Sequence, residues 1–317
     1  MLEKLIRVNY DIEVKSLSLF DSHFGTEIFV ANAVDGKYIV KTLPSLHDNL
    51  ESEGRVTDYL HGAGISVARL IKTVNNMYHV QTDKMQFHIQ EFIEGKVLHV
   101  NTAPGWFLDK SADILGKIHC TLRIYEELPI NFGVDFFDVS TVDSSKRYYA
   151  KRLTEAKQDQ ILVRSLEERL KHLERISAFK IDVDKITYSN SHGDFHIGQI
   201  ITKGEKITVI DWTAACKLPI CLEVIMSFVT ADPFCKDGSI NIDRLRRYID
   251  IYSRHFTLTD YDMMIMPYVL YYQQLICHYS PPYYEVAESY KPMCKLINNF
   301  TDWLYENVEI LSEKLCS

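Results

Sequence analysis

The chain has 317 residues, of which 46% are apolar and 25% charged. This composition excludes a chain that is mainly disordered and fits two or three domains or one two-lobed unit. The net charge of −8 argues against a nucleic-acid-binding protein, because contact with phosphates needs clustered lysine and arginine. Seven cysteines without C-x-x-C spacing argue against a zinc ribbon or a disulfide framework.

The sequence predicts neither a signal peptide nor a membrane-spanning segment. Residues Met1–Arg7 include an acid and lack the apolar core of a signal peptide. The most apolar stretch, Met263–Tyr279, contains a proline and two glutamines, and it is shorter than the roughly 20 apolar residues that cross a bilayer. We predict a buried helix there and a cytoplasmic protein with no membrane or nucleic-acid partner. The oligomeric state is not indicated.

The first third of the chain is predicted to form strands around one helix. Residues Ile28–Val34 and Lys37–Leu43 flank Asp35-Gly36, a dipeptide typical of a two-residue hairpin turn. A helix with an apolar stripe at Leu50, Val56 and Leu60 follows and ends at the glycines of positions 62 and 64. Short strands are predicted over 67–72, 78–81 and 87–92.

After Glu94-Gly95 the pattern becomes helical. Apolar residues recur at helical spacing over 108–122 and over 166–173, and the chain from Ile242 onward is also predicted to be helical. One hairpin, Gln199–Thr202 with Lys206–Ile210, interrupts this half. The sequence therefore predicts an α+β fold with two lobes: a small antiparallel β lobe with one helix, residues 1–94, and a larger, mostly helical lobe, residues 95–317.

The densest polar cluster in an apolar context is Ser191–Gln199, which precedes this hairpin. Asp194 lies before the hairpin and Asp211 just after it, so we expect the two carboxylates to lie close together, with Gln199 at the base of the first strand. Two carboxylates and an amide oxygen suit Mg²⁺. Alternatively, one carboxylate orients a hydroxyl and accepts its proton. Both functions are needed for phosphoryl transfer.

Two other interpretations of this cluster remain open. In the first, His-Gly-Asp is simply a turn whose acids are solvated. In the second, His192, Asp194 and His196 are the ligands of a metal ion that catalyses hydrolysis. The hydrolase interpretation gives the N-terminal lobe no role.

Two charged residues of the N-terminal lobe are predicted to point inward. Lys41 shares a strand face with Ile39 and Leu43, because side chains alternate along a strand. Glu53 falls on the apolar stripe of the next helix. Inward-pointing Lys and Glu from adjacent elements are expected to form an ion pair, which holds the amine against the phosphates of a nucleotide.

With these polar residues, the chain resembles the aminoglycoside phosphotransferase (APH) and choline kinase-like superfamily, whose members have a protein-kinase-like fold. The resemblance covers about residues 19–229. It rests on six features that occur in the order of that family: Lys41, Glu53, Gln90–Gly95, Leu115–His119, His192–His196 and Ile210–Trp212.

The resemblance implies roles for the polar cluster. Asp194 corresponds to the catalytic base and Asp211 to the Mg²⁺-binding aspartate, while Glu223 corresponds to a structural acid. The family usually has asparagine five residues after the base, where this chain has Gln199. The amide oxygen of Gln199 still reaches a metal, although the extra methylene loosens the geometry.

The resemblance also implies a nucleotide site. Lys41 corresponds to the phosphate-binding lysine and Glu53 to its partner, and the backbone of Glu91, Phe92 and Ile93 corresponds to the hinge that binds the base of ATP or GTP. The phosphate loop is expected over 21–27 and contains one glycine. A single glycine offers fewer backbone amides to phosphates than a glycine-rich loop.

The implied activity is that of a small-molecule kinase, which moves the γ-phosphate of a nucleotide to an acceptor hydroxyl with Mg²⁺. Antibiotics of the aminoglycoside or macrolide type, sugars and amino alcohols are the acceptor classes considered. The alternative is a nucleotide-binding pseudokinase, suggested by Gln199 and the phosphate loop. Two sets of residues near the C-terminus are candidate acceptor contacts: acids, which suit the amines of an aminoglycoside, or tyrosines, which suit a flatter acceptor. The expected role of each tyrosine is nevertheless helical core. The candidates are Asp260, Asp262, Glu285, Glu288, Tyr268, Tyr271, Tyr272, Tyr279, Tyr283 and Tyr284.

Overall fold

The computed structural model describes residues 1–23, 26–43, 50–99, 102–156, 160–276 and 291–317. The chain forms two compact units, each of two segments. The first unit contains Met1–Leu98 and Gly198–Ala215, and the second contains His99–Ile197 and Cys216–Ser317. The contacts thus join the central hairpin to the N-terminal segment. The functional division into lobes 1–94 and 95–317 stays a prediction.

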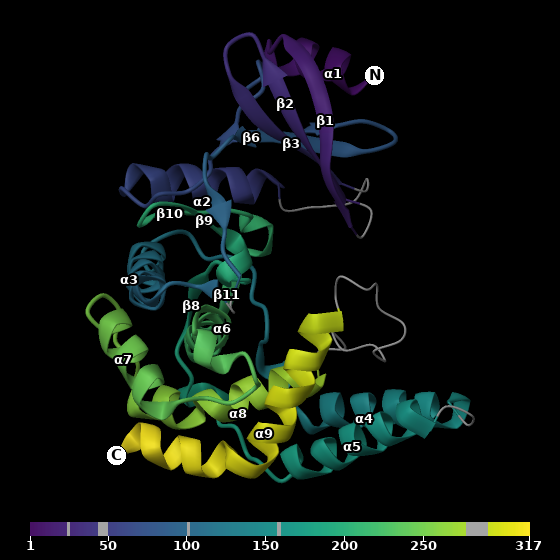
Figure 1. The fold of residues 1–317 in the computed structure, drawn as a ribbon, viewed down its shortest axis with the longest axis vertical. Coiled ribbons are helices and arrows are strands. Elements are labelled where there is room, and N and C mark those ends of the chain that lie inside the picture. The colour runs from purple at the N-terminus through teal and green to yellow at the C-terminus, as the bar shows by residue number, and fades with distance from the viewer. Residues whose placement is uncertain (24–25, 44–49, 100–101, 157–159, 277–290) are drawn as a thin grey trace. The chain divides into compact units, whose positions relative to one another are not determined.

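The first unit is built on an antiparallel sheet with the strand order β1-β2-β3-β6-β4, and β5 pairs with β6 (Figure 1). The predicted hairpin is confirmed, because Asn32 pairs with Lys37 around the turn. The strands are β1 (Val14–His23), β2 (Thr26–Ala33), β3 (Lys37–Leu43), β4 (Leu70–Ile71), β5 (Val80–Gln81) and β6 (Gln86–Glu91).

The predicted phosphate loop over 21–27 is mostly strand. β1 extends to His23 and β2 starts at Thr26, and these two residues pair with each other. Residues 24 and 25 lie outside the described part of the chain. The predicted loop bounds are too wide because antiparallel pairing between β1 and β2 continues as far as His23 and Thr26.

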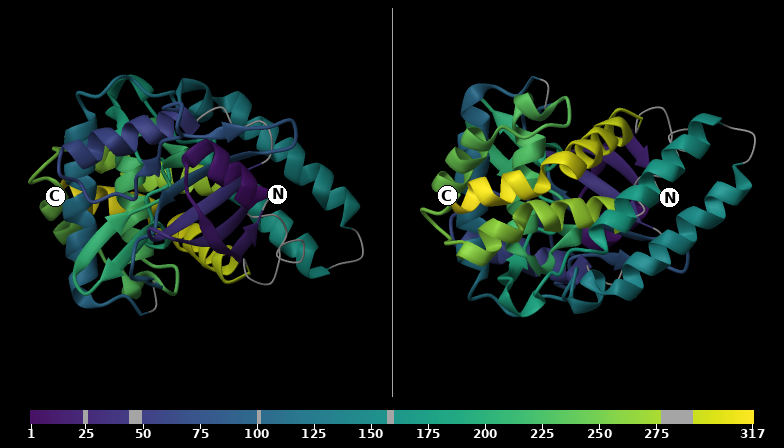
Figure 2. Two further views of the ribbon diagram at one scale, coloured as in Figure 1. Left: turned by 90° about the horizontal axis from the view of Figure 1, so that it is seen from above. Right: turned by 90° about the horizontal axis from the view of Figure 1, so that it is seen from below.

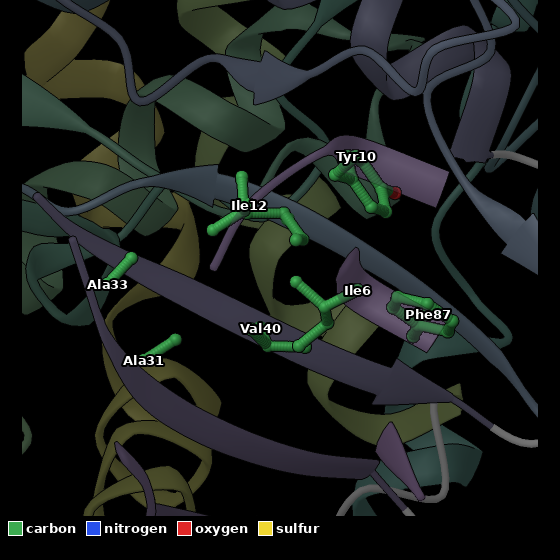
Figure 3. Packing of buried hydrophobic residues seen from close by; sticks show 8 residues of the cluster. Ile6, Tyr10, Ile12, Ala31, Ala33, Val40 and Phe87 are labelled. Atoms are coloured by element: carbon green, nitrogen blue, oxygen red, sulfur yellow. The ribbon is translucent and has the colours of Figure 1, made fainter. Parts of the chain in front are cut away.

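A helix that the sequence analysis did not predict covers one face of this sheet. Helix α1 (Leu2–Tyr10) buries Ile6 and Tyr10 against Val40 and Phe87 (Figure 3). Ile6 and Tyr10 lie four residues apart and therefore share one face of the helix. The described residues of the N-terminal segment consequently contain two helices rather than one.

The opposite sheet face carries polar residues, among them the predicted site residue Lys41. On this face, Lys41 of β3 pairs across the strands with His88 of β6. Helix α2 (Leu50–Gly62) follows β3 in the chain.

A second, three-stranded sheet has the order β10-β9-β7. Its strands are β7 (Lys96–Val97), β9 (Ile200–Lys203) and β10 (Lys206–Val209). Gly95, just before β7, has φ 155°, and a Cβ atom there would lie 2.5 Å from the carbonyl oxygen of Thr202 in β9. The close approach of these two backbone segments therefore needs glycine.

The second unit is mainly helical. Strands β8 (Tyr188–Ser191) and β11 (Cys216–Pro219) pair antiparallel. Helix α4 lies beside α5, and α8 beside α9 (Figure 2). The helices are α3 (Gly105–Leu122), α4 (Val139–Glu155), α5 (Gln160–Ile176), α6 (Ile220–Ala231), α7 (Ile242–Tyr252), α8 (Asp260–Ile276) and α9 (Lys291–Cys316).

The predicted fold class is confirmed: an N-terminal antiparallel sheet precedes a larger helical part. The buried helix expected over 263–279 corresponds to α8, although residues 277–279 lie outside the described ranges. Within those ranges, every helix is too short or too polar to cross a membrane.

Candidate active site

Lys41 and Asp211 form the central ion pair of the first unit. Lys41 is only 9% exposed, and its Nζ donates a hydrogen bond to Asp211 Oδ1 at 2.7 Å. The expected pair between Lys41 and Glu53 is not formed, because the end of β10 places Asp211 beside the amine. Glu53 Oε2 has no hydrogen-bond partner among the described residues.

Glu53 nevertheless points inward, as its place on the apolar stripe of α2 predicts. The residue is 2% exposed. Burial raises the pKa of its carboxyl to about 7, although the charge of Lys41 opposes this shift. The first unit therefore contains a buried acid that changes its charge near neutral pH.

His88 also lies on this face, and the sequence analysis missed it. It is fully buried, and neither ring nitrogen has a hydrogen-bond partner among the described residues. Burial and the nearby Lys41 lower its pKa to about 3, so the imidazole is neutral. The available signal was the alternation of polar Gln86, His88 and Gln90 along β6.

Gln199 lies at the start of the hairpin that leads to Asp211. It is the last residue of a short 3₁₀ helix, η4 (Ile197–Gln199), and its carbonyl oxygen accepts a hydrogen bond from the amide of Ile210 at 2.9 Å. This bond pairs Gln199 with Ile210, the residue just before Asp211, across the base of the hairpin. Carboxylate and amide oxygens are the hard donors that Mg²⁺ prefers, so this donor set fits the ion.

The expected hinge begins at Glu91, the last residue of β6. The Glu91 carboxylate accepts hydrogen bonds from Arg69, the shortest at 2.6 Å, and the Glu91 amide donates to the Arg69 carbonyl at 3.0 Å. Because the Glu91 amide is engaged, the amides available for a nucleotide base are those of Phe92 and Ile93. Lys37 lies over the Phe92 ring, 5.5 Å from its centroid.

In the second unit, Asp194 lies on a tightly held loop after β8. The preceding residue, Gly193, has φ 87°, and its amide donates to Glu223 Oε1 at 2.6 Å. The side chain of Asp194 is 47% exposed, and its Oδ2 lies 3.5 Å from His196 Nε2. The loop thus presents an accessible carboxylate from a fixed backbone.

A buried network fixes the position of Glu223. Its Oε2 lies 2.8 Å from His119 Nε2, and His119 Nδ1 lies 2.7 Å from the Tyr252 hydroxyl. Burial alone would raise the pKa of Glu223, but hydrogen bonds with His119 and the Gly193 amide and electrostatic interaction with His119 and His192 outweigh it and lower the pKa below its ordinary value. The structural role expected of Glu223 is confirmed, whereas His119 and Tyr252 were missed as its partners.

The structure contradicts the hydrolase interpretation. His192 is fully buried, and its Nδ1 accepts a hydrogen bond from the amide of Asp194 at 3.3 Å. All three proposed ligands are described, and the described ranges contain no group of three or more His, Cys, Asp or Glu side chains that could bind a metal ion. The interpretation fails because His192 is a packing residue of the loop.

Comparison with protein-family models identifies the family. The model of the phosphotransferase enzyme family (APH) matches residues 17–259. The chain belongs to this family. The resemblance seen in the motifs and the predicted enzyme class, phosphotransferase, are thereby confirmed. No curated protein matches the sequence.

Solved structures share the fold of this APH family member. An amicoumacin kinase, solved with AMP-PNP and Ca²⁺, is 13% identical with a TM-score of 0.67, and the match covers 98% of this chain and 92% of that one. A microcompartment-associated aminopropanol kinase is 14% identical, with a TM-score of 0.63 and coverages of 100% and 98%. A spectinomycin phosphotransferase, solved with ADP and spectinomycin, is 15% identical, with a TM-score of 0.57 and coverages of 99% and 98%.

The predicted site residues of this APH family member divide between the two units. Lys41, Glu53, Gln199 and Asp211 lie in the first, as does the hinge, whereas Asp194 lies in the second. The predicted proximity of Asp194 and Asp211 therefore stays a prediction.

Several of the candidate acceptor contacts belong to the helical core, as expected for the tyrosines but not for Asp262. Asp262 is fully buried and accepts hydrogen bonds from Thr187 and Thr259. Tyr271 is also fully buried, and its hydroxyl lies 2.7 Å from His172 Nδ1. Tyr272 is 3% exposed. Five other candidates lie outside the described residues: Glu285, Glu288, Tyr279, Tyr283 and Tyr284.

Replacing Glu53 by glutamine should change how stability depends on pH. The pKa of Glu53 is raised from 4.5 to about 7 in the folded protein, so the folded state prefers the protonated acid. As the pH rises from about 4.5 to about 7, the free energy of unfolding of wild type should therefore fall by about 3 kcal/mol relative to that of Glu53→Gln. Urea unfolding of both proteins at about pH 5 and about pH 8 measures this difference.

The matched control is Glu13→Gln, which removes an exposed acid of the same unit. Its unfolding free energy should follow that of wild type at both pH values. If Glu53→Gln also runs parallel to wild type, Glu53 does not titrate in this interval.

Proposed function

We propose that this protein transfers the γ-phosphoryl group of a nucleoside triphosphate to a hydroxyl group of a small molecule. The observation that carries the proposal is the Lys41–Asp211 ion pair, which joins a nearly buried amine to a carboxylate 170 residues away. In a phosphotransferase, an amine and a carboxylate held together serve the phosphates and their metal ion.

The first unit would bind the nucleotide. The Lys41 amine pairs with phosphate oxygens, and the buried carboxyl of Glu53 lies close enough to interact electrostatically with this amine. The backbone of Phe92 and Ile93 contacts the base. Asp211 and Gln199 are the residues that would hold Mg²⁺, which when bound neutralises charge that develops on the phosphates.

Asp194 would act on the acceptor. Its accessible carboxylate accepts the proton of the acceptor hydroxyl as the new oxygen–phosphorus bond forms. The bond between the γ-phosphorus and the bridging oxygen breaks, and the nucleoside diphosphate leaves with that electron pair. Glu223 supports this step by fixing the amide of Gly193, the residue before Asp194.

We propose that the acceptor carries an amine as well as a hydroxyl. The structures that share the fold include kinases of amicoumacin, spectinomycin and aminopropanol, and aminopropanol contains both groups. The net charge of −8 favours a cationic acceptor, because an ammonium group is attracted to carboxylates. Transfer to a neutral sugar but to no amine-bearing acceptor would contradict this part of the proposal.

A thermal-shift assay with ATP and GTP, each with and without Mg²⁺, tests nucleotide binding first. The proposal predicts that at least one nucleotide raises the melting temperature, and by more with Mg²⁺ than without it, since a bound ligand stabilises only the folded state. No shift with either nucleotide would contradict the proposal.

Substitutions of Gln199 separate an active kinase from a pseudokinase. Gln199→Asn should preserve or raise phosphoryl transfer, because asparagine supplies the same amide oxygen. Gln199→Leu should lower the rate by about a hundredfold or more, since a metal ligand stabilises the transition state by several kcal/mol. If wild type and both variants show only background nucleotide hydrolysis across an acceptor panel, the pseudokinase alternative is correct.

A further inference from the structure

The backbone at Asp211 is unusual. The residue has φ 59° and ψ 71°, in the left-handed region. This conformation is unfavourable for an ordinary residue, and aspartate tolerates it better because its short side chain forms local hydrogen bonds. The chain turns here from β10 into a short 3₁₀ helix, η5 (Trp212–Ala214). The position thus fixes the direction in which the carboxylate leaves the backbone.

Two donors also fix the rotation of this carboxylate. Thr213 Oγ1 donates to Asp211 Oδ1 at 2.7 Å, and Lys41 Nζ donates to the same oxygen at 2.7 Å. One carboxylate oxygen offers about two lone-pair sites. Thr213 and Lys41 therefore account for the accepting capacity of Oδ1.

The two donors differ in charge, and this difference matters when a cation binds. Lys41 is a cation and competes with a metal ion for the negative charge of Asp211. The Thr213 hydroxyl is neutral, so it does not repel a metal ion. It also comes from the same turn, two residues away. Thr213 is thus the donor that keeps the carboxylate oriented whether or not Lys41 remains paired with it.

We propose that Thr213 is a positioning residue, whose hydroxyl orients the Asp211 carboxylate for a divalent cation. The inference rests on the proposed metal-binding role of Asp211. Removing a hydrogen-bond partner of a metal-binding side chain typically weakens metal affinity 10–100-fold. Thr213→Val keeps the shape of the side chain and removes only the donor, so it should weaken Mg²⁺-dependent binding by about this factor.

Calorimetric titration of the full chain with AMP-PNP, with and without Mg²⁺, tests the inference. Thr213→Val should bind metal-free AMP-PNP as wild type does but lose most of the tightening that Mg²⁺ brings. Thr213→Ser should keep this tightening, because serine retains the hydroxyl. The matched control is Thr208→Val, which removes a hydroxyl 2.9 Å from Ser66 Oγ in the same unit, and it should behave as wild type.

Other outcomes would overturn the inference. If Thr213→Val keeps the Mg²⁺ effect while Asp211→Asn loses it, Asp211 binds the metal without help from Thr213. If Thr213→Val weakens metal-free and Mg²⁺-dependent binding alike and lowers the melting temperature, Thr213 supports the turn only. If wild type binds AMP-PNP equally with and without Mg²⁺, the proposed role of Asp211 fails, and the role of Thr213 fails with it.

Discussion

Replacing Asp194 by alanine should reduce phosphoryl transfer by about 10²–10⁴-fold, the usual contribution of a positioned general base. Nucleotide binding should persist, because the residues proposed to bind the nucleotide lie in the other unit. Steady-state rates and the affinity for AMP-PNP, measured on the same preparation, separate these two effects. The variant should fold normally, since the Asp194 side chain is 47% exposed.

A matched control is Asp184→Ala, which removes an exposed carboxylate from the same unit. It should retain the wild-type rate and affinity. Transfer by Asp194→Ala within a few-fold of wild type would show that Asp194 is not the base.

Replacing Asp211 should abolish the dependence of nucleotide binding on Mg²⁺ and, with it, most of the activity. Asparagine is the cleaner substitution, because it tolerates the left-handed backbone and keeps an acceptor for Thr213. Alanine would add backbone strain and leave the nearly buried Lys41 without its partner. Titration of AMP-PNP with and without Mg²⁺ measures the effect.

The chain offers a close control for this substitution. Asp11 also has a positive φ, 56°, and lies exposed in the same unit at the end of α1. Asp11→Asn makes the same chemical change in a similar backbone conformation and should leave the Mg²⁺ effect intact. An unchanged Mg²⁺ effect in Asp211→Asn would place the metal site elsewhere.

The sequence predicted those features that depend on local periodicity. The inward direction of Lys41 follows from the two-residue period of a strand, and that of Glu53 from the apolar stripe of a helix. The hairpin before Asp211 follows from turn residues between two short apolar runs. Each of these predictions uses neighbours within a few positions, where spacing alone determines the face.

Pairing between distant segments was not predictable in the same way. Two inward-pointing charges in adjacent elements suggested a Lys41–Glu53 pair, but the end of β10 brings a competing carboxylate to the amine. Spacing also does not distinguish a functional polar residue from one that stabilises the core. Asp262 and Tyr271 have the chemistry of acceptor ligands, yet both are fully buried with internal partners.

The most direct test of the proposed function is detection of the phosphorylated acceptor. Wild type would be incubated with Mg²⁺, ATP or GTP and a panel of amino alcohols and aminoglycosides, and the products would be weighed by mass spectrometry. The account predicts that one acceptor gains a single phosphoryl group as an equal amount of nucleoside diphosphate forms, and that Asp194→Ala and Asp211→Asn yield far less of both products in the same time. An acceptor phosphorylated equally well by either variant would contradict the account, as would nucleotide hydrolysis without any phosphorylated acceptor.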